Sequence, residues 1–340
     1  MTTAASRTLR VGLTYDLASE HLKQGATEEE AAEFDREDTI AGIESALTVL
    51  GHRPERIGSI HELTRRLVAG HTWDFVFNIA EGCHGVARES QVPALLDAYR
   101  IPYTFSDPLV LAITLHKGYT KTLVRAAGVP TSDDQLITSL TDLEQLRLNY
   151  PLFAKPVGEG TSKGIEADSV VRNRQQLEAV CKRILERCRQ PVLVETYLPG
   201  REFTVGILGA GENARSLGAL EVFLVGDADQ GVYSFRNKKQ FIGKVEYQWV
   251  RAAADPTVGS VEDVALSAWR ALGCRDAGRV DIRLNDQGTP CFIEVNPLAG
   301  LNPEISDLAI LVRQTGLGYQ GLIEAIVNET ISRLPTASGR

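Results

Sequence analysis

Alternating apolar and polar residues predict two neighbouring strands near the carboxyl end of the chain, over 278–284 and 291–296. Successive side chains of a strand point to opposite faces, so each run has one apolar and one polar face. In the second run, Cys291, Ile293 and Val295 are expected to share the apolar face. The segment Asn285–Gly288 between the runs has the composition of a turn, which predicts an antiparallel hairpin.

The polar face of this hairpin carries candidate chemistry. Asp281, Glu294 and Asn296 are expected to converge there, with Arg279 beside them. Three oxygen ligands and a neighbouring guanidinium suit a hard cation that carries nucleotide phosphates. For the hairpin alone, an exposed polar sheet face without an ion is the simpler interpretation. The rest of the chain favours the metal site.

Elsewhere the pattern predicts alternating strands and helices. Strands are expected at 9–14 and 73–78, a helix from about Ile40 to Leu50, and a helix at 92–99 followed by a short strand at 101–103. This β–α alternation predicts a small parallel-sheet domain over residues 1–113. The acidic segment 16–38 is weakly periodic, and much of it is expected to be loop.

The remainder of the chain predicts two further domains, over 114–200 and 201–335. The first is expected to contain a helix at 115–127, strands at 151–156 and 191–195, and an amphipathic helix at 176–188 with apolar residues at i, i+3, i+4 and i+7. Strands within 203–224 and a helix at 261–272 precede the hairpin. The expected fold class is therefore α/β and α+β.

Composition narrows the function classes. The chain has 340 residues, 43% of them hydrophobic and 24% charged, as in ordinary globular proteins. Its net charge of −8 and the lack of a basic stripe argue against nucleic-acid binding, and no apolar run is long enough for a membrane span. Without a signal-peptide pattern, the expected location is the cytoplasm. Five cysteines without a Cys-x-x-Cys pair and six scattered histidines predict neither disulfides nor a zinc site.

A glycine-rich segment, Lys155–Gly164, is the second element with candidate chemistry. Lys155 at a strand end places a cation where phosphate oxygens can reach it, and the backbone N–H groups of the following loop can close over them. The sequence is not a Walker A loop. A flexible surface loop is the alternative interpretation.

Taken in order, these pieces resemble ATP-grasp ligases, most closely the D-alanine–D-alanine ligase branch. The resemblance covers about residues 100 to 300, and its matching stretches are His116-Lys117, Lys155–Ser162, Val194–Leu198, Gly200–Leu208, Gly278–Asp281 and Glu294–Asn296. It implies an ATP-grasp fold in which ATP lies between the second and third domains.

The resemblance also implies roles for individual residues. Lys117, Lys155 and Lys238 would reach the nucleotide phosphates, Glu202 would bind the ribose, and adenine would meet the segment Glu195, Thr196, Tyr197 and Leu198. Asp281, Glu294 and Asn296 would hold Mg²⁺, or Mn²⁺ in its place. Arg279 and the backbone N–H of Gly300 would stabilise an oxyanion. Solvated surface lysines at Lys117 and Lys238, and local ion pairs at Glu202 and Arg279, remain alternatives.

The residues expected around the amino-acid substrates depart from the family pattern. By spacing, Glu37 takes the place of a family glutamate, Thr161 (beside Ser162) that of a serine, and Lys239 that of a tyrosine, whose phenol is lost. Ser306 is expected to hold the acceptor carboxylate, and Glu304 to repel it. Glu81 and Arg88 follow a strand of the first domain with Asn78 and Glu89, where they would bind the donor substrate or form a loop ion pair.

These departures predict an ADP-forming carboxylate–amine ligase that works through an acyl phosphate on amino-acid-like substrates other than two D-alanines. An authentic D-alanine–D-alanine ligase is the alternative. A nucleotide-binding regulatory protein without turnover is the third hypothesis. The expected partners are a small-molecule carboxylate and amine, with neither nucleic acid nor membrane. The resemblance also implies a homodimer formed through the first domain.

Overall fold

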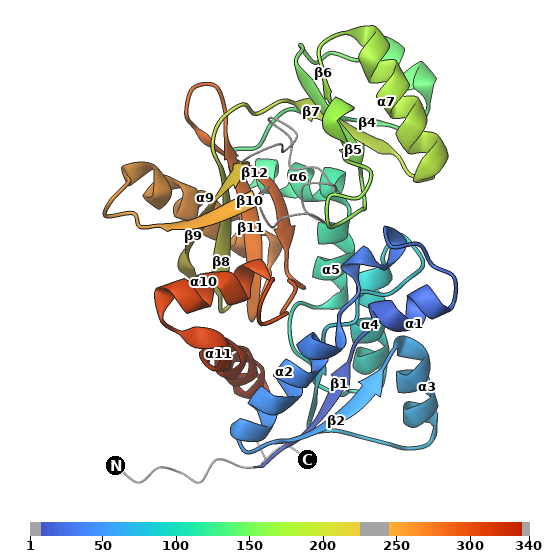
Figure 1. Cartoon of the computed structure of the whole chain (residues 1–340), viewed down its shortest axis with the longest axis vertical. Coiled ribbons are helices and arrows are strands. Elements are labelled where there is room, and N and C mark those ends of the chain that lie inside the picture. The colour runs from blue at the N-terminus through green and yellow to red at the C-terminus, as the bar shows by residue number, and fades with distance from the viewer. Residues whose placement is uncertain (1–7, 225–244, 335–340) are drawn as a thin grey trace.

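The computed structural model describes residues 8–224 and 245–334, which form three β-sheets surrounded by helices (Figure 1). Lys238 and Lys239, for which the sequence predicts site roles, lie outside the described residues. No helix in the described ranges is long and apolar enough to cross a membrane.

The N-terminal sheet is parallel, as predicted, and has the order β2-β1-β3. Its strands are β1 (Arg10–Thr14), β2 (Arg53–Gly58) and β3 (Phe75–Asn78), and its helices are α2 (Glu37–Val49), α3 (Ile60–Val68) and α4 (Gln91–Ala98). The sequence pattern misses β2 because only Ile57 of this charged strand is buried.

Much of the segment after β1 is loop, as expected, but it also contains α1 (Ala18–Lys23) and the short 3₁₀ helix η1 (Glu30–Glu33). One expectation for this part of the chain is wrong. The strand expected at 101–103 is reduced to one isolated bridge between Tyr103 and Val76.

The central sheet has the order β4-β7-β5-β6 and is antiparallel. Its strands are β4 (Asp134–Ile137), β5 (Leu152–Pro156), β6 (Val170–Val171) and β7 (Val192–Thr196). The predicted amphipathic helix is α7 (Arg174–Arg187), which buries Leu177, Val180, Cys181 and Ile184 against this sheet. Figure 1 shows α7 and the central sheet at one end of the molecule.

The C-terminal sheet is antiparallel, with the order β10-β9-β8-β11-β12. Its strands are β8 (Glu202–Leu208), β9 (Arg215–Leu224), β10 (Val245–Val250), β11 (Ala277–Leu284) and β12 (Pro290–Asn296). Two helices pack against it, α9 (Pro256–Leu272) and α10 (Asp307–Thr315). A Cβ on Gly278 would meet the Trp269 ring of α9 and one on Gly206 would meet Leu311 of α10, so both helices lie directly on the strands.

The predicted hairpin is formed by β11 and β12, but a bulge alters its faces. Ile282 pairs with Phe292 and Asp281 pairs with Glu294, so Ile293 between them has no paired residue on β11. Phe292 is therefore fully buried in the core with Val295, while Ile293 turns towards the polar side, where it lines a pocket beside Glu294. The predicted alternation of Cys291, Ile293 and Val295 on one face is wrong because a bulge adds one residue to a strand.

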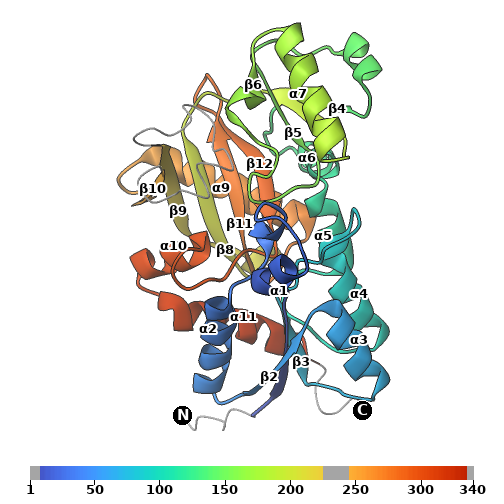
Figure 2. The same cartoon turned by 45° about the vertical axis from the view of Figure 1, so that its right-hand side comes forward.

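Linking and terminal helices join the three sheets. The helices α5 (Pro108–Leu115) and α6 (Lys117–Ala126) connect the N-terminal and central sheets, and His116 between them caps α6 by accepting the Tyr119 N–H. The last helix, α11 (Gly318–Ser332), packs against α2 (Figure 2). Ile40 and Ile43 of α2 share one buried cluster with Ile323 of α11, so the two ends of the chain form a common core.

Candidate active site

Two adjoining cavities lie where the three sheets meet. The larger has a volume of about 630 Å³ and is lined by the N-terminal region, the glycine-rich loop and the segment after β12. The smaller, of about 100 Å³, lies between the central and C-terminal sheets. Arg279 and Glu294 line both, so they mark the boundary at which two bound molecules could meet.

The smaller cavity collects most of the residues that the sequence assigns to the nucleotide. Its lining includes Lys155, Ser162, Glu195, Thr196, Tyr197, Leu198, Glu202, Asp281 and, at the boundary, Arg279 and Glu294. Lys117 lies in the larger cavity, where its Nζ contacts Glu294 Oε2 at 3.2 Å and donates to the Glu159 carbonyl at 2.6 Å.

A buried ion network under the smaller cavity includes a residue that the sequence analysis missed. Lys121 of α6 is fully buried, and its Nζ lies 2.5 Å from Glu195 Oε2 and 2.6 Å from Ser132 Oγ. Lys155 Nζ contacts the other Glu195 oxygen at 2.7 Å. Burial would raise the pKa of Glu195, but the two ammonium groups hold it at about 2. One carboxylate thus lies between two lysines beside the end of β5.

The candidate metal ligands lie on adjacent strands, as the hairpin predicts. Asp281 is paired in register with Glu294, and Asn296 with Arg279. Thr204 Oγ1 donates to Asp281 Oδ1 at 2.8 Å, which orients this carboxylate. Arg279 forms ion pairs with Asp281 and, at 3.4 Å, with Asp307 Oδ2.

These residues fit a hard divalent cation. All three offer oxygen, the donor that Mg²⁺ prefers. The buried amide nitrogen of Asn296 has no hydrogen-bond partner in the described structure. No hydrogen bond of this nitrogen therefore opposes a rotation of the amide that would point its oxygen at an ion. Burial, together with the charges of Glu294 and Asp307, raises the pKa of Asp281 to about 6 despite Arg279, and a bound divalent cation would relieve this crowding of carboxylates.

The glycine-rich loop lies between the two cavities. Thr161 lines the larger one and Ser162 the smaller. Both have left-handed backbone, with φ of 50° and 56°, which is unusual for residues other than glycine and strained for a β-branched one. Such strain persists where surrounding contacts enforce it, commonly at ligand sites.

The contact that holds this loop comes from Glu33 of η1. Its carboxylate accepts the Gly160 N–H at 2.7 Å and pairs with Lys163 at 2.8 Å and Arg88 at 3.2 Å. Arg88, predicted to bind substrate, instead donates to Glu33 and to the Gly158 carbonyl, and is not among the cavity-lining residues. The loop ion pair, the alternative for Arg88 in the sequence, is the arrangement found.

Another predicted residue also lies elsewhere. Glu37 starts α2 with an exposed side chain that pairs with Arg56 at 2.5 Å, outside both cavities. Glu33 and Asp35, a few residues earlier, face the larger cavity instead. The sequence does not single them out, because their segment is only weakly periodic.

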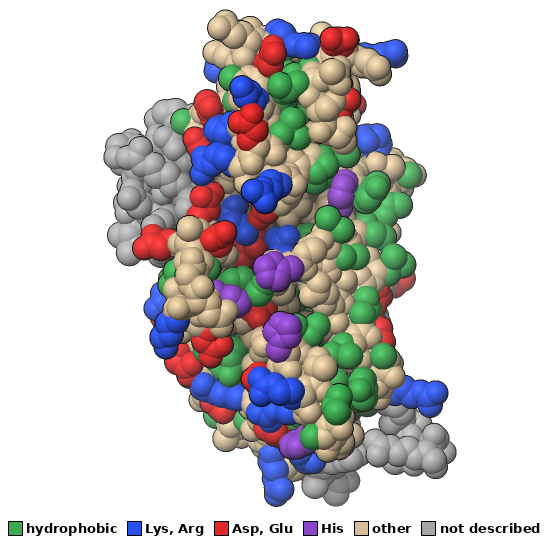
Figure 3. All heavy atoms as spheres, turned by 90° about the vertical axis from the view of Figure 1, so that its right-hand side faces the viewer, with side chains coloured by type: hydrophobic (Ala, Val, Ile, Leu, Met, Phe, Trp, Pro, Cys, Tyr) green, Lys and Arg blue, Asp and Glu red, His purple; other side chains and the backbone are tan. Residues whose placement is uncertain are grey.

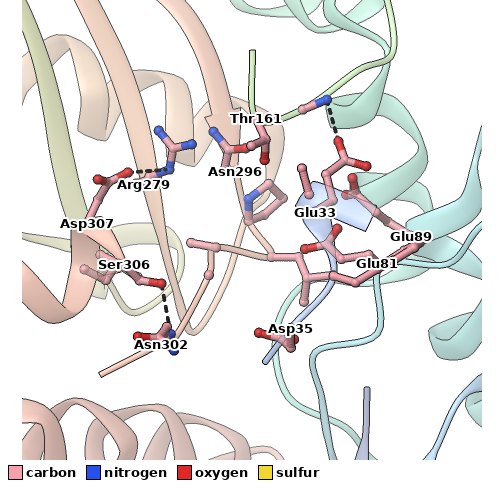
Figure 4. Close-up of a pocket in the computed structure, with 18 of the residues that line it drawn as sticks. Glu33, Asp35, Glu81, Glu89, Thr161, Arg279, Asn296, Asn302, Ser306 and Asp307 are labelled. Carbon is pink, nitrogen blue, oxygen red and sulfur yellow. Dashed lines mark hydrogen bonds and ion pairs between the residues drawn. The ribbon is translucent and has the colours of Figure 1, made fainter. Parts of the chain in front are cut away.

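One wall of the larger cavity is acidic. Figure 4 shows Glu33, Asp35, Glu81 and Glu89 on one side, opposite Arg279, Asp307 and Ser306. The carboxylates of Glu81 and Glu89 form no hydrogen bond or ion pair with any described residue. Burial raises the pKa of Glu81 well above its usual range and that of Glu89 to about 7.

The opposite wall holds the remaining predicted substrate residues. Gly300 and Ser306 both line the cavity, and Ser306 Oγ accepts the Asn302 N–H at 2.9 Å. Glu304, expected to repel an acceptor carboxylate, is exposed and pairs with Arg313 at 3.0 Å outside the cavity. That expectation is wrong because the turn before α10 points Glu304 outwards.

A family model described as D-ala D-ala ligase C-terminus matches residues 123–328. This chain belongs to the D-alanine–D-alanine ligase family. It is 32% identical over 300 residues to the D-alanine–D-alanine ligase of Bordetella avium, covering 86% of this chain and 89% of that protein. It is also 32% identical over 257 residues to the uncharacterized protein y4sG of Sinorhizobium fredii, covering 76% and 74%.

Solved structures agree on the fold. D-alanine–D-alanine ligase from Bacillus anthracis complexed with ATP superposes with a TM-score of 0.72 at 21% identity, covering 96% of this chain and 98% of that one. VanG D-Ala:D-Ser ligase from Enterococcus faecalis gives 0.72 at 17% identity, covering 95% and 100%. The predicted ATP-grasp fold and family are confirmed, and the chain is an ATP-dependent ligase that forms carbon–nitrogen bonds.

Proposed function

We propose that this ligase releases ADP and joins a carboxylate to an amine, using substrates other than two D-alanines, at least one of which carries an additional amino group. The acidic wall of the larger cavity is the observation that carries this proposal. The cavity lining includes seven carboxylates and three cationic side chains among the described residues. The carboxylates are Glu28, Glu33, Asp35, Glu81, Glu89, Glu294 and Asp307, and the cations Arg36, Lys117 and Arg279.

Two members of this wall form no ion pair. Glu33, Glu294 and Asp307 pair with Lys163, Lys117 and Arg279 respectively, whereas Glu81 and Glu89 form no ion pair and feel the charge of Arg88 only from a longer distance. Burying carboxylates without a partner is unfavourable, and a bound ammonium group relieves that cost. A substrate with a second amine, such as a diamino acid, therefore complements this wall better than alanine does.

The nucleotide side follows from the smaller cavity. We infer that ATP lies between the units 114–200 and 201–335, with its phosphates near Lys155 and Lys117, its adenine along 195–198 and its ribose at Glu202. The structural neighbour that is complexed with ATP has the same fold, which supports ATP binding by this chain. Lys238 remains a predicted phosphate contact outside the described residues.

The proposed reaction takes place at the boundary between the cavities. A carboxylate oxygen of the donor attacks the γ-phosphorus of ATP, ADP leaves, and the resulting acyl phosphate is attacked by the amine, which loses a proton as phosphate departs. Arg279 lies where both steps occur, and its guanidinium with the Gly300 N–H would stabilise the oxyanion. Asp281, Glu294 and Asn296 would hold Mg²⁺, which neutralises phosphate charge.

The test is ADP release by the purified protein with Mg²⁺ and ATP over amino acids of both chiralities, singly and paired, with diamino acids included. We expect release with pairs that include a diamino acid, and a raised KM for that substrate in Glu89→Gln. Glu304→Gln is the matched control, because Glu304 is exposed and outside the cavity. Release with D-alanine alone at comparable kcat/KM would establish the authentic D-alanine–D-alanine ligase, which the Bordetella avium relative favours.

We also infer a homodimer formed through the N-terminal part of the chain. Val68, Tyr99 and Leu109 are large apolar residues with exposed side chains there. Figure 3 shows hydrophobic side chains lying together along one edge of the molecule. Light scattering should give twice the chain mass of 37.1 kDa, and a monomer at all concentrations would contradict the inference.

A further inference from the structure

Three potential metal ligands meet behind the acidic wall, outside the ligase machinery. Asp16 follows β1, His21 lies on α1, and Cys83 lies in the loop after β3. One ligand atom from each lies within 4.8 Å of the other two. Among the described residues this is the one group of three or more His, Cys, Asp and Glu side chains that meets this condition. The sequence shows no spacing typical of a zinc site, because these three residues come from separate segments that only the fold brings together.

Two of the three distances between ligand atoms are close to those around a tetrahedral zinc ion. With Zn–S of about 2.3 Å and Zn–N and Zn–O of about 2.0 Å, tetrahedral angles place S and N about 3.5 Å apart and N and O about 3.3 Å apart. Cys83 Sγ lies 3.6 Å from His21 Nε2, and His21 Nε2 lies 3.9 Å from Asp16 Oδ1. A shift of about half an ångström in the Asp16 carboxylate would bring its distance from His21 Nε2 to the tetrahedral value, and the third distance, between Cys83 and Asp16, is within 4.8 Å.

The sulfur of Cys83 lies 3.6 Å from Nε2 and 3.9 Å from Nδ1 of His21, and Nε2 is also the nitrogen beside Asp16. A metal-bound imidazole points one nitrogen at the ion, so zinc binding would turn the His21 ring until Nε2 alone faces Cys83 and Asp16.

Neighbouring contacts hold two of the ligands in place. Asp16 Oδ2 accepts the Gly82 N–H at 2.9 Å, which leaves Oδ1 directed to His21. The His21 ring packs on Phe34 with ring centroids 4.1 Å apart. Such outer contacts orient the ligands of protein metal sites. Figure 3 shows several histidine side chains near the middle of one face of the molecule.

We propose that Asp16, His21 and Cys83 form a Zn²⁺ site whose fourth position is open to water. The mixed sulfur, nitrogen and oxygen set suits zinc rather than Mg²⁺ or Ca²⁺, which prefer oxygen alone. The site fastens the segment after β1 to the loop after β3. Both segments are in contact with residues that line the larger cavity. Phe34 packs on His21, and the Asp35 N–H donates to the Asp16 carbonyl at 2.9 Å. Glu81, which also lines the cavity, directly precedes Gly82. The ion would thus stiffen the acidic wall without touching substrate.

The test is metal binding by the full chain, prepared with a phosphine reductant and freed of metal with EDTA. Zn²⁺ is titrated against a chromophoric chelator, and Co²⁺ is added separately to detect a thiolate-to-metal charge-transfer band. We expect one Zn²⁺ per chain, a cobalt band in the wild type, and at least tenfold weaker zinc binding in both Cys83→Ser and His21→Gln. The cobalt band should vanish in Cys83→Ser.

Two controls separate the site from general effects. His84→Gln changes the histidine next to Cys83, and Cys188→Ser changes a cysteine of the central sheet region, so both should bind zinc as the wild type does. Circular dichroism checks that each variant folds. Failure of the wild type to take zinc from the chelator, or equal binding by Cys83→Ser and His21→Gln, would overturn the proposal. Neither result depends on ligase activity.

Discussion

The buried network of Lys121, Glu195 and Lys155 makes a quantitative prediction about stability. Glu195→Gln keeps the shape of the side chain but removes the one negative charge between two ammonium groups 2.5 and 2.7 Å away. At an effective dielectric constant of about 20, each contact corresponds to about 6 kcal/mol of Coulomb attraction, much of it offset by desolvation. Removing one partner of a buried pair typically costs about 3–5 kcal/mol. We expect Glu195→Gln to lower the free energy of unfolding by that amount.

A double-mutant cycle isolates the ion pair from packing effects. Lys121→Met leaves Glu195 paired with Lys155, so we expect a smaller loss of about 2 kcal/mol. The combined variant should lose less than the sum of the two single variants by at least about 1 kcal/mol, because Glu195→Gln has already removed the charge that Lys121 needs. Glu62→Gln, which breaks the exposed ion pair with Arg65 on α3, is the matched control and should have little effect.

The assay is urea denaturation followed by far-ultraviolet circular dichroism, with the slope of the transition compared between variants. An unchanged slope shows that the change lies in stability rather than in the extent of unfolding. A loss below about 1 kcal/mol in Glu195→Gln, or strict additivity in the double variant, would refute the reasoning.

Three further predictions concern single residues. Gly278→Ala should lower the free energy of unfolding by about 1–3 kcal/mol in thermal unfolding, because its Cβ would lie 2.6 Å from the Asn296 carbonyl oxygen and the Trp269 ring. Gly259→Ala in α9 is the control and should leave stability unchanged, because the nearest atom to its Cβ would be 4.0 Å away. Arg279→Met should lower kcat about 10²- to 10³-fold, and near-normal turnover would exclude its proposed role. Burial raises the pKa of Glu89 from 4.5 to about 7, so the stability this group contributes is complete below pH 4.5 and is lost as the pH rises through 7. Glu89→Gln should therefore gain on the order of 1–2 kcal/mol over the wild type at pH 8 and little at pH 4.5, and an equal difference at both would contradict this.

Much of the fold follows from periodicity. The helix α7 and the strands β11 and β12 were predictable because their apolar residues recur at helical or strand spacing and are buried. Other elements carry no such signal. Three of the six residues of β2 are charged, and the bulge at Ile293 changes which side chains reach the core without changing the composition of β12.

The residues of the candidate active site also fall into a group that the sequence predicts and a group that it does not. The nucleotide residues lie within strands or directly after them, so their spacing predicted that they converge. The substrate wall depends on how η1 and the loop after β3 fold back towards the C-terminal sheet. For that reason Glu33 and Glu89 line the cavity whereas Glu37, at the start of α2, turns away to Arg56. Lys121 lies one helical turn after Lys117, but only the packing of α6 shows that it is buried against Glu195.

The most direct test of the proposed function is ADP release with Mg²⁺ and ATP, comparing D-alanine alone with pairs in which one amino acid is a diamino acid. The acidic wall predicts turnover with the diamino acid, weak turnover with D-alanine alone, and a KM for the diamino acid that rises in Glu89→Gln but not in Glu304→Gln. Efficient turnover of D-alanine alone, unchanged in Glu89→Gln, would contradict the assignment of this wall to a cationic substrate.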